Sequence, residues 1–394
     1  MSEAFTVCFC GTSCTRDEGE ATRDGSNKLI YSTQTGYIPV RIHLEISGDL
    51  HATHPSVTVR GPGENDWASP RTTSEPLMLD GPLKPTPDLL SDARPYSGGD
   101  QRSSVSTATG WDAAALALHG ANLAAGSRMP NYNFIGHSRG AVECVMAAWF
   151  LYAYGQPSAK VRIIAIDPVP GPGNWYGILT QLPPNVVEYV GITAWDHLDT
   201  GFNGLVPRPN AQMAGSTAQL KLGSTWTRLA DTYQLDDPLK PKPGAPQPVG
   251  YHLYASRGRH ATVAGNATSD GKYDASLVTA GAARVPQLIY RLARAYLTSW
   301  GTDFRVKSAV GAGALQLRQE INLDHAMFDA MGGGALRDSI QPNRPYVRQV
   351  SSISGRNPFN TYYLEDVTGD PPYRQPYPVT AARTGGGWAH WTFL

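Results

Sequence analysis

One pentapeptide constrains the fold of this chain more than any other feature. Ser138 stands at the centre of Gly136-His137-Ser138-Arg139-Gly140, between an apolar run at 132–135 and a small, apolar, helix-like run at 141–154. A strand, a tight turn and a helix in this order predict a serine with a strained backbone, whose hydroxyl lies above the edge of a sheet. The glycines leave room where a Cβ atom would collide with neighbouring backbone. This context favours a nucleophilic serine over a chance match in a chain with 41 glycines.

The bulk composition narrows the class of protein. A chain of 394 residues has room for one large α/β domain with insertions or for two ordinary domains. Lys plus Arg balances Asp plus Glu at 33 each, so the basic surface of a nucleic-acid binder is missing and no nucleic-acid partner is expected. The first residues contain no basic and apolar signal segment, and no apolar run approaches the ~20 residues that span a bilayer. We therefore expect synthesis in the cytoplasm as a soluble product without a signal peptide.

The cysteines give no sign of a metal site. Cys8 and Cys10 alternate on one face of an expected strand, and Cys144 lies in the expected helix after Ser138, which favours buried thiols. Cys14 completes the set, and no second ligand pair follows at a spacing typical of zinc. We expect no metal, no required disulfide and no cofactor.

The pattern of apolar residues alternates between strands and helices. Alternation of this kind predicts an α/β fold with a doubly wound, mostly parallel sheet and a functional site at the carboxyl ends of the strands. Residues 1–300 are expected to form the catalytic domain, with loop insertions at about 61–110 and 200–250, and residues 301–394 a C-terminal extension packed on it. The expected strands are 4–9, 37–46, 57–60, 132–135, 161–166, 185–194 and 251–255, the expected helices are 111–125, 141–154 and 286–300, and the expected packing residues of the extension are Trp388, Trp391 and Phe393.

A serine hydroxyl is a poor nucleophile unless an imidazole accepts its proton and a carboxylate orients that imidazole. In a fold with this elbow the order along the chain is Ser, acid, His. His260 lies in a small, turn-rich loop just after the last expected strand and is favoured as the general base. His325 stays open as an alternative, whereas His252 lies within that strand and is expected to pack.

Two aspartates compete for the role of the acid. Asp167 ends the expected strand 161–166, and Asp196 ends the strand that follows. The end of the second strand beyond the serine is the commoner position of the acid, which favours Asp196. Asp167 remains the alternative, and either residue could instead cap a turn or a helix.

The oxyanion of the reaction needs two backbone N–H donors. One comes from the residue after the nucleophile, which is Arg139. The second is expected from the turn that holds Gly11 and Thr12, because a glycine lets the backbone approach the substrate. An ordinary β-turn is the competing interpretation.

Four short motifs in this order resemble those of the type VI secretion lipase effectors, a family of antibacterial phospholipases with an α/β-hydrolase core. The resemblance covers roughly residues 4–300, with the elbow as its most diagnostic part. It implies an α/β-hydrolase fold, cleavage of phospholipid acyl esters, and secretion by a type VI system into the periplasm of a target cell. It also implies a secretion spike or adaptor and a cognate immunity protein as partners. The motifs are Phe9-Cys10-Gly11-Thr12, Arg60-Gly61-Pro62-Gly63, Gly136-His137-Ser138-Arg139-Gly140-Ala141 and Gly258-Arg259-His260.

The chain departs from this family at two points. Cys10 stands where the family often has an acid, and the Asp-Val-Gly-Gly run that commonly follows the family's histidine is absent after His260. The most similar arrangement elsewhere is His325 with Asp329 and the glycines at 332–334, so His325 remains an alternative for the general base. In addition, Ile166-Asp167-Pro168 is similar to a neutral-lipase motif in which the aspartate is the triad acid.

A lipase needs apolar surface for an acyl chain and commonly a mobile cover over its site. Residues 172–184 and 200–250 are the two segments that could supply it, with core packing as the competing interpretation. Neither has a strongly basic amphipathic helix, so contact with a membrane is expected to be transient. The alternatives to a phospholipase are a soluble carboxylesterase or neutral lipase without a toxin role, and a catalytically silent binding module.

Overall fold

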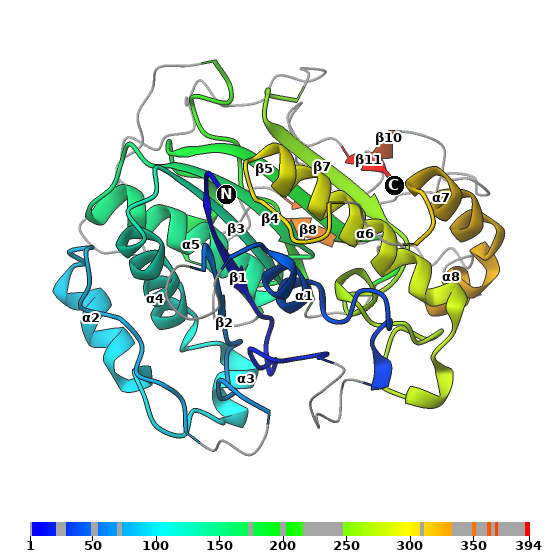
Figure 1. The fold of residues 1–394 in the computed structure, drawn as a ribbon, viewed down its shortest axis with the longest axis horizontal. Coiled ribbons are helices and arrows are strands. Elements are labelled where there is room, and N and C mark those ends of the chain that lie inside the picture. Colours follow the sequence, from blue (N-terminus) through cyan, green and yellow to red (C-terminus); the bar gives the residue numbers. More distant parts are fainter. Residues whose placement is uncertain are drawn as a thin grey trace.

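A parallel β-sheet forms the centre of the molecule. The computed structural model describes residues 2–20, 29–48, 54–68, 73–171, 176–197, 202–215, 247–307, 311–332, 349–351, 361–363, 367–368 and 391–394. Eight strands lie in the order β10-β11-β7-β5-β4-β3-β1-β2, and every pair of neighbours is parallel (Figure 1). This confirms the α/β class and the parallel sheet. The strands are β1 (Phe5–Phe9), β2 (Ser56–Val59), β3 (Asn131–His137), β4 (Lys160–Ile166), β5 (Val186–Ala194), β7 (Tyr251–Ser256), β10 (Val367–Thr368) and β11 (Trp391–Phe393).

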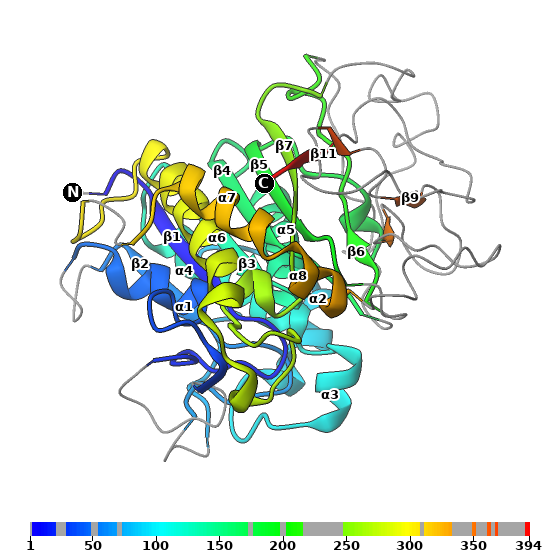
Figure 2. The ribbon, with the colours of Figure 1, turned by 90° about the vertical axis from the view of Figure 1, so that its right-hand side faces the viewer.

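Helices cover both faces of this sheet. Helices α4 (Ala113–Gly126) and α5 (Arg139–Tyr154) lie on one face, and α1 (Ile38–Glu45) and α6 (Ala280–Ser299) lie on the other (Figures 1 and 2). Because side chains alternate along a strand, β1 contributes to both cores. Val7 and Phe9 pack in the cluster that contains α4 and α5, whereas Cys8 and Cys10 pack in the cluster that contains α1 and α6. The two cysteines therefore share one face, as expected, and both are buried free thiols.

The expected strand at 37–46 is wrong, because these residues form helix α1. Pro39 lies in the first turn of that helix, where a missing N–H costs nothing. Ile38 and Ile42 are one turn apart and both are buried, whereas Leu44 is 36% exposed. Ile38 and Ile42 thus share one face of the helix, although the apolar residues alternate along the sequence.

Helix α6 begins earlier than expected from the sequence. Thr279 caps its first turn by accepting the N–H of Ala282 at 3.1 Å, and Pro286 lies inside the helix rather than at its start. A proline usually marks the first turn, but here Ala282 and Val285, which precede Pro286 in the helix, are already buried.

The C-terminal segment extends the central sheet. Strand β11 pairs with β7 and carries β10 on its outer side, so the C-terminus lies beside the sheet (Figures 1 and 2). Trp391 and Phe393 are buried there, as expected, and Trp388 lies outside the described residues. The remaining elements are α2 (Pro87–Ala93), α3 (Ser104–Thr109), α7 (Ala314–Leu323), α8 (His325–Met331), and a small sheet of β6 (Gly204–Leu205), β8 (Gln349–Ser351) and β9 (Thr361–Tyr363). Within the described ranges, no helix has both the length and the apolar character needed to cross a membrane.

Candidate active site

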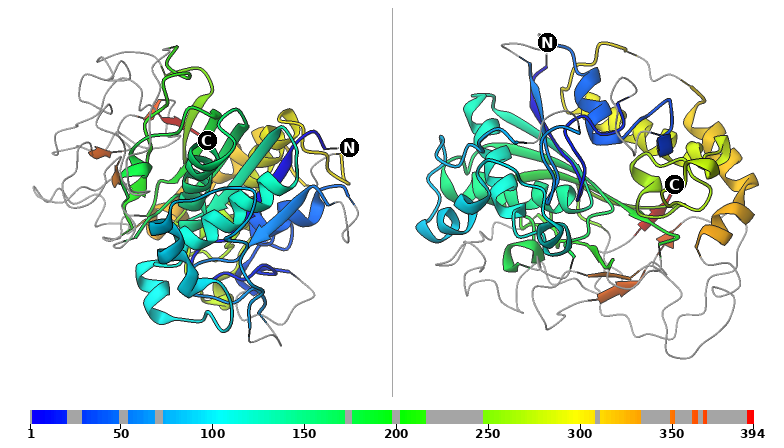
Figure 3. Two further views of the ribbon diagram at one scale, coloured as in Figure 1. Left: turned by 90° about the vertical axis from the view of Figure 1, so that its left-hand side faces the viewer. Right: turned by 90° about the horizontal axis from the view of Figure 1, so that it is seen from below.

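Ser138 lies in the turn between β3 and α5, at the carboxyl ends of the central strands. Figure 3 shows the sheet with helices on both sides from two further directions. The φ angle of Ser138 is 58°, in the left-handed region that is costly for a residue with a side chain. A Cβ on Gly136 would lie 2.3 Å from the carbonyl oxygen of Gly140, and one on Gly140 would lie 2.4 Å from that of Cys10. The two glycines of the motif are therefore required by the packing of β3 and α5 against β1.

Asp167 and His260 form a buried pair at the same edge of the sheet. His260 Nδ1 lies 2.6 Å from Asp167 Oδ2, and Asp167 is completely buried. The other carboxylate oxygen accepts the N–H of Ala194 at 3.0 Å, which fixes the orientation of the carboxyl group. Asp167 also has a positive φ of 39°, so backbone strain recurs at this site.

The preference for Asp196 as the acid is not supported by this geometry, which brings Asp167 to His260. Asp196 is completely buried, and Arg257 binds both its oxygens, with Nε at 2.8 Å from Oδ2 and Nη2 at 3.0 Å from Oδ1. The N–H of Gly258 donates to Oδ2 at 2.7 Å. The strand order explains the difference: β4, which ends directly before Asp167, is the neighbour of β3, whereas β5, which precedes Asp196, is one strand further from Ser138.

The two other histidines weighed in the sequence analysis, His325 and His252, lie away from this pair. His325 begins helix α8, its side chain is 45% exposed, and its Nδ1 lies 3.9 Å from Asp329 Oδ2. His252 lies in β7 with its ring against Tyr296, as expected for a packing residue. Neither histidine lines the cavity that contains Ser138.

Ser138 and His260 line one cavity of about 580 Å³. Within the part of the chain that the structure describes, Ser138 Oγ and His260 Nε2 form no hydrogen bond to each other or to another residue. The Nε2 atom is the ring nitrogen that Asp167 leaves available. The cavity wall is mostly apolar and aromatic, with Ile30, Tyr31, Val169, Phe202, Ala261, Ala264 and Tyr273.

Thr12 and Arg139 retain the two backbone donors that could hold an oxyanion. The structure corrects the role expected for Gly11, because its N–H donates to Tyr37 Oη at 2.7 Å. The N–H groups of Thr12 and Arg139 have no hydrogen-bond partner among the described residues, and both residues line the cavity. Arg139 is the first residue of α5, where a helix leaves its N–H groups unsatisfied and its dipole favours negative charge.

The Arg139 side chain connects the turn after β1, the end of helix α3 and the loop after β4. Its Nη1 donates to Thr12 Oγ1 at 2.8 Å and to the carbonyl oxygen of Thr107 at 2.6 Å. Its Nη2 and Nε donate to the carbonyl oxygens of Ala108 at 2.7 Å and Pro170 at 3.1 Å. From the sequence, only the backbone N–H of Arg139 is assigned a role, as an oxyanion donor. Nothing in the motif predicts which segments its guanidinium contacts.

The turn after β2 supports the turn that contains Thr12. A Cβ on Gly61 would lie 1.6 Å from the carbonyl oxygen of Gly11. The backbones of these two turns are therefore too close together for any residue other than glycine at position 61. The N–H of Ser13 donates to the carbonyl oxygen of Pro62 at 3.0 Å. The glycine-rich segment after β2 therefore has a packing role beside the proposed oxyanion donors.

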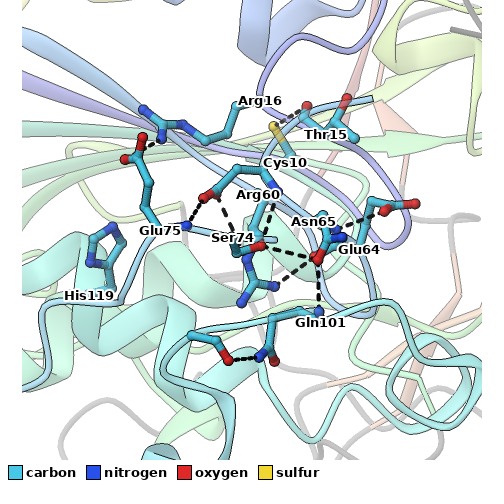
Figure 4. Close-up of polar contacts among 12 residues, drawn as sticks. Cys10, Thr15, Arg16, Arg60, Glu64, Asn65, Ser74, Glu75, Gln101 and His119 are labelled. Carbon is cyan, nitrogen blue, oxygen red and sulfur yellow. Dashed lines mark hydrogen bonds and ion pairs between the residues drawn. The ribbon is translucent and has the colours of Figure 1, made fainter. Parts of the chain in front are cut away.

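A polar network holds this second turn in place (Figure 4). The buried side chain of Arg60 donates to the carbonyl oxygen of Glu64 at 2.9 Å. Asn65 Oδ1 accepts the N–H of Gln101 at 2.7 Å and the hydroxyl of Ser74 at 3.2 Å. The insertion at 61–110 is thus tied to the core through buried hydrogen bonds.

The two segments expected to cover the site, 172–184 and 200–250, are placed differently in the structure. Ile178, Leu179 and Leu182 are buried in the core cluster that contains α5, so the part of 172–184 within the described ranges packs as core and not as a cover. Residues 172–175 lie outside the described residues, as does most of 200–250. Phe202 is the described residue of that second segment that reaches the cavity, and it is 41% exposed.

No family model and no curated protein matches this sequence. A solved structure described as an uncharacterized protein from Pseudomonas aeruginosa aligns with a TM-score of 0.38 and 13% sequence identity. The alignment covers 86% of this chain and 52% of that chain, so the present chain spans about half the length of that protein. Among the described residues, no group of three or more His, Cys, Asp or Glu side chains lies together in a way that could hold a metal ion.

Glu143 lies behind the elbow on helix α5, and its carboxyl group has an unusual environment. It is completely buried, and neither side-chain oxygen has a hydrogen-bond partner among the described residues. Burial raises its pKa well above the ordinary value, and Asp112 adds to that effect, against the opposing influence of Arg60 and Arg139. The folded protein therefore holds Glu143 as a neutral acid above the pH at which an unfolded chain releases the proton.

Glu143→Gln is expected to stabilise the protein increasingly as the pH rises. Below the unfolded pKa of about 4.3, both states are protonated and the residue makes no pH-dependent contribution. Above it, the unfolded state loses a proton that the folded state retains, so the free energy of unfolding of the wild type falls by about 1.4 kcal/mol per pH unit until the folded pKa is reached. Urea unfolding of both proteins between pH 5 and 8 measures this difference. Glu75→Gln, at an exposed site, serves as the control, and a Glu143→Gln difference that is independent of pH contradicts the assignment.

Proposed function

We propose that this protein is a serine ester hydrolase with an α/β-hydrolase fold. The observation that carries the proposal is the 2.6 Å contact between His260 Nδ1 and Asp167 Oδ2 at the cavity that also contains the strained Ser138. An Asp-His pair beside a serine at a strand-to-helix turn is the arrangement that activates a hydroxyl for acyl transfer.

The reaction follows from the role of each side chain. The carboxylate of Asp167 keeps the proton of His260 on Nδ1, so Nε2 accepts the proton of Ser138 as Oγ attacks the acyl carbonyl carbon. The N–H groups of Thr12 and Arg139 stabilise the resulting oxyanion. His260 returns the proton to the departing alcohol as the carbon–oxygen ester bond breaks. A water molecule, deprotonated by His260, then attacks the acyl-enzyme. The bond between Ser138 Oγ and the acyl carbon breaks, His260 returns the proton to Oγ, and the carboxylic acid is released. During substrate binding Oγ and Nε2 must come within hydrogen-bond distance, as is common when a site closes on its substrate.

The lining of the cavity supports an acyl ester with an apolar chain. Its apolar and aromatic residues offer contact to a hydrocarbon group, and a volume of about 580 Å³ is in the range of small-molecule sites. No Asp or Glu among the described residues lines it, whereas the cationic residue Arg139 does. An ester beside an anionic phosphate is therefore tolerated electrostatically, which favours phospholipid as the substrate and transient contact with a membrane.

Lipid extraction and mass spectrometry test the substrate class. Wild type and Ser138→Ala are incubated with mixed bacterial phospholipids, and free fatty acid plus lysolipid is expected with the wild type alone. Phosphatidic acid as the product contradicts acyl cleavage. If the protein hydrolyses short-chain soluble esters rapidly but leaves phospholipid vesicles intact, it is a soluble carboxylesterase instead.

The sequence resemblance supports a role as an antibacterial effector delivered to the periplasm, with an adaptor and an immunity protein as partners. Directed expression tests it. Export of the protein to the periplasm of a bacterial host by an added signal peptide is expected to stop growth, whereas the cytoplasmic form and exported Ser138→Ala are tolerated. Normal growth with exported, catalytically active protein contradicts the effector role without contradicting the hydrolase.

A further inference from the structure

A chain of hydrogen bonds connects the turn that contains Thr12 to the loop that contains His260. The N–H of Gly11 lies 2.7 Å from Tyr37 Oη, and Tyr37 Oη lies 3.0 Å from His137 Nδ1. His137 Nε2 lies 3.0 Å from the backbone carbonyl oxygen of His260. Tyr37 and His137 are 2% and 7% exposed, so solvent competes little for these bonds.

The partners at the two ends fix the direction of every bond. The N–H of Gly11 can only donate and the carbonyl of His260 can only accept, so His137 must carry its proton on Nε2. Burial lowers the pKa of His137 to about 3, so the ring is neutral near pH 7 and Nδ1 is an acceptor. Tyr37 donates to that nitrogen, and burial raises its pKa well above the ordinary value, which keeps the phenol protonated. Each donor in the chain therefore meets one acceptor, and a single tautomer of His137 satisfies them all.

His137 contacts His260 through its ring as well as through the hydrogen bond from its Nε2 atom. The rings of His137 and His260 are 4.6 Å apart between centroids, in addition to the hydrogen bond to the His260 backbone. A Cβ on Gly11 would lie 3.0 Å from His137 Nδ1 and 3.1 Å from the Cβ of Ser138, so the turn after β1 touches both residues of the elbow. Tyr37, at the N-terminus of α1, contacts both this turn and His137 through its hydroxyl group.

We propose that Tyr37 and His137 are positioning residues that place His260 against Ser138 and hold Gly11 so that the neighbouring Thr12 N–H faces the cavity. This inference rests on the proposed hydrolase function. Tyr37 occupies the Gly11 N–H and leaves the donors of Thr12 and Arg139 for the oxyanion. His137 anchors the backbone of the general base from the residue next to the nucleophile.

Tyr37→Phe tests the proposal, with Tyr132→Phe as the matched control. Tyr132 is also buried, its hydroxyl donates to Gln156 Oε1 at 2.6 Å, and it lies at the opposite end of β3 from His137. Tyr132→Phe loses one hydrogen bond, whereas Tyr37→Phe loses the two bonds to Gly11 and His137 and so interrupts the chain of hydrogen bonds. We expect kcat for a soluble ester to fall about 10- to 100-fold in Tyr37→Phe, with KM within about twofold, because small displacements of catalytic groups have effects of this size. Tyr132→Phe is expected to keep the wild-type kcat.

Two His137 variants separate positioning from a general loss of structure. Glutamine in place of His137 can still donate to the His260 carbonyl from a position close to that of Nε2, whereas leucine cannot. His137→Gln is therefore expected to retain at least about tenfold more kcat than His137→Leu. Equal activity of the two variants overturns the anchoring role of His137.

Nitrogen NMR of the histidine rings provides a readout that needs no catalysis. The wild type is expected to show His137 as the neutral Nε2–H tautomer throughout pH 5–8, and Tyr37→Phe is expected to change the Nδ1 chemical shift. An inactive wild type that shows this tautomer contradicts the proposed function alone. A wild type that hydrolyses esters, together with a Tyr37→Phe variant of equal kcat, contradicts the positioning role alone.

Discussion

Replacing Ser138 by alanine is expected to lower kcat for ester hydrolysis by at least about 10⁴-fold, since removal of a serine nucleophile leaves only binding and oxyanion stabilisation. The substitution removes one hydroxyl from the turn and leaves the positive φ of the residue in place. The free energy of unfolding is therefore expected to change little. Initial rates with a chromogenic acyl ester and urea unfolding measure the two quantities on the same preparation.

Ser127→Ala is the matched control for that experiment. Ser127 lies before β3, where its hydroxyl donates to the carbonyl oxygen of Ala124 at 2.6 Å, away from the cavity. It is expected to keep the wild-type kcat. Hydrolysis by Ser138→Ala at the wild-type rate means that the elbow has a structural role and supports a catalytically silent binding module.

The two aspartates are expected to give opposite results when each is replaced by asparagine. Asp167→Asn keeps the shape of the residue but donates an N–H where His260 needs an acceptor, so the imidazole adopts the wrong tautomer. We expect kcat to fall by about 10⁴-fold, the size of effect typical of this substitution in a triad. The asparagine has the same size as the aspartate and its oxygen can still accept the N–H of Ala194, so the fold is expected to survive.

Asp196→Asn is expected to act on stability. It breaks the buried ion pair between Asp196 and Arg257, whose guanidinium also contacts Asp329 at 2.9 Å. Breaking a buried ion pair typically costs about 3–5 kcal/mol. The folded fraction is expected to retain activity, measured at low temperature where the variant is folded. Loss of activity in folded Asp196→Asn, with full activity in Asp167→Asn, reverses the assignment of the acid.

The sequence predicts the elbow well because its requirements are local. The glycines at 136 and 140, the apolar strand and the small residues of the helix all lie within a few positions of Ser138, and their steric reasons are visible in the sequence. The parallel sheet is predicted for a similar reason, because each buried strand is a short apolar run.

The acid could not be chosen from the sequence because that choice depends on which strands are neighbours. Asp167 and Asp196 both follow apolar strands, and only the order β5-β4-β3 shows that the first of them adjoins Ser138. The partner of Asp196 is Arg257, which is 61 residues away in the chain and carries no local signal. The same limit applies to Gly11, whose N–H is taken by the distant Tyr37.

Helix α1 illustrates a different limit. Its apolar residues at 38, 40, 42, 44 and 46 alternate in the manner of a strand, and the sequence therefore predicts one. Pro39 is the single local residue that argues against a central strand, since it lacks the N–H that a sheet requires. Tyr37, the positioning residue proposed above, is at the N-terminus of this helix, so the error also concealed its contact with His137.

Mapping the site of covalent modification tests the central claim most directly. The wild type is treated with a fluorophosphonate, digested and analysed by peptide mass spectrometry. The adduct is expected on Ser138 alone, with labelling rates greatly reduced in His260→Gln and Asp167→Asn. Stable attachment to another residue, or labelling of Ser138 at equal rates in all three proteins, contradicts a hydroxyl activated by the His260–Asp167 pair.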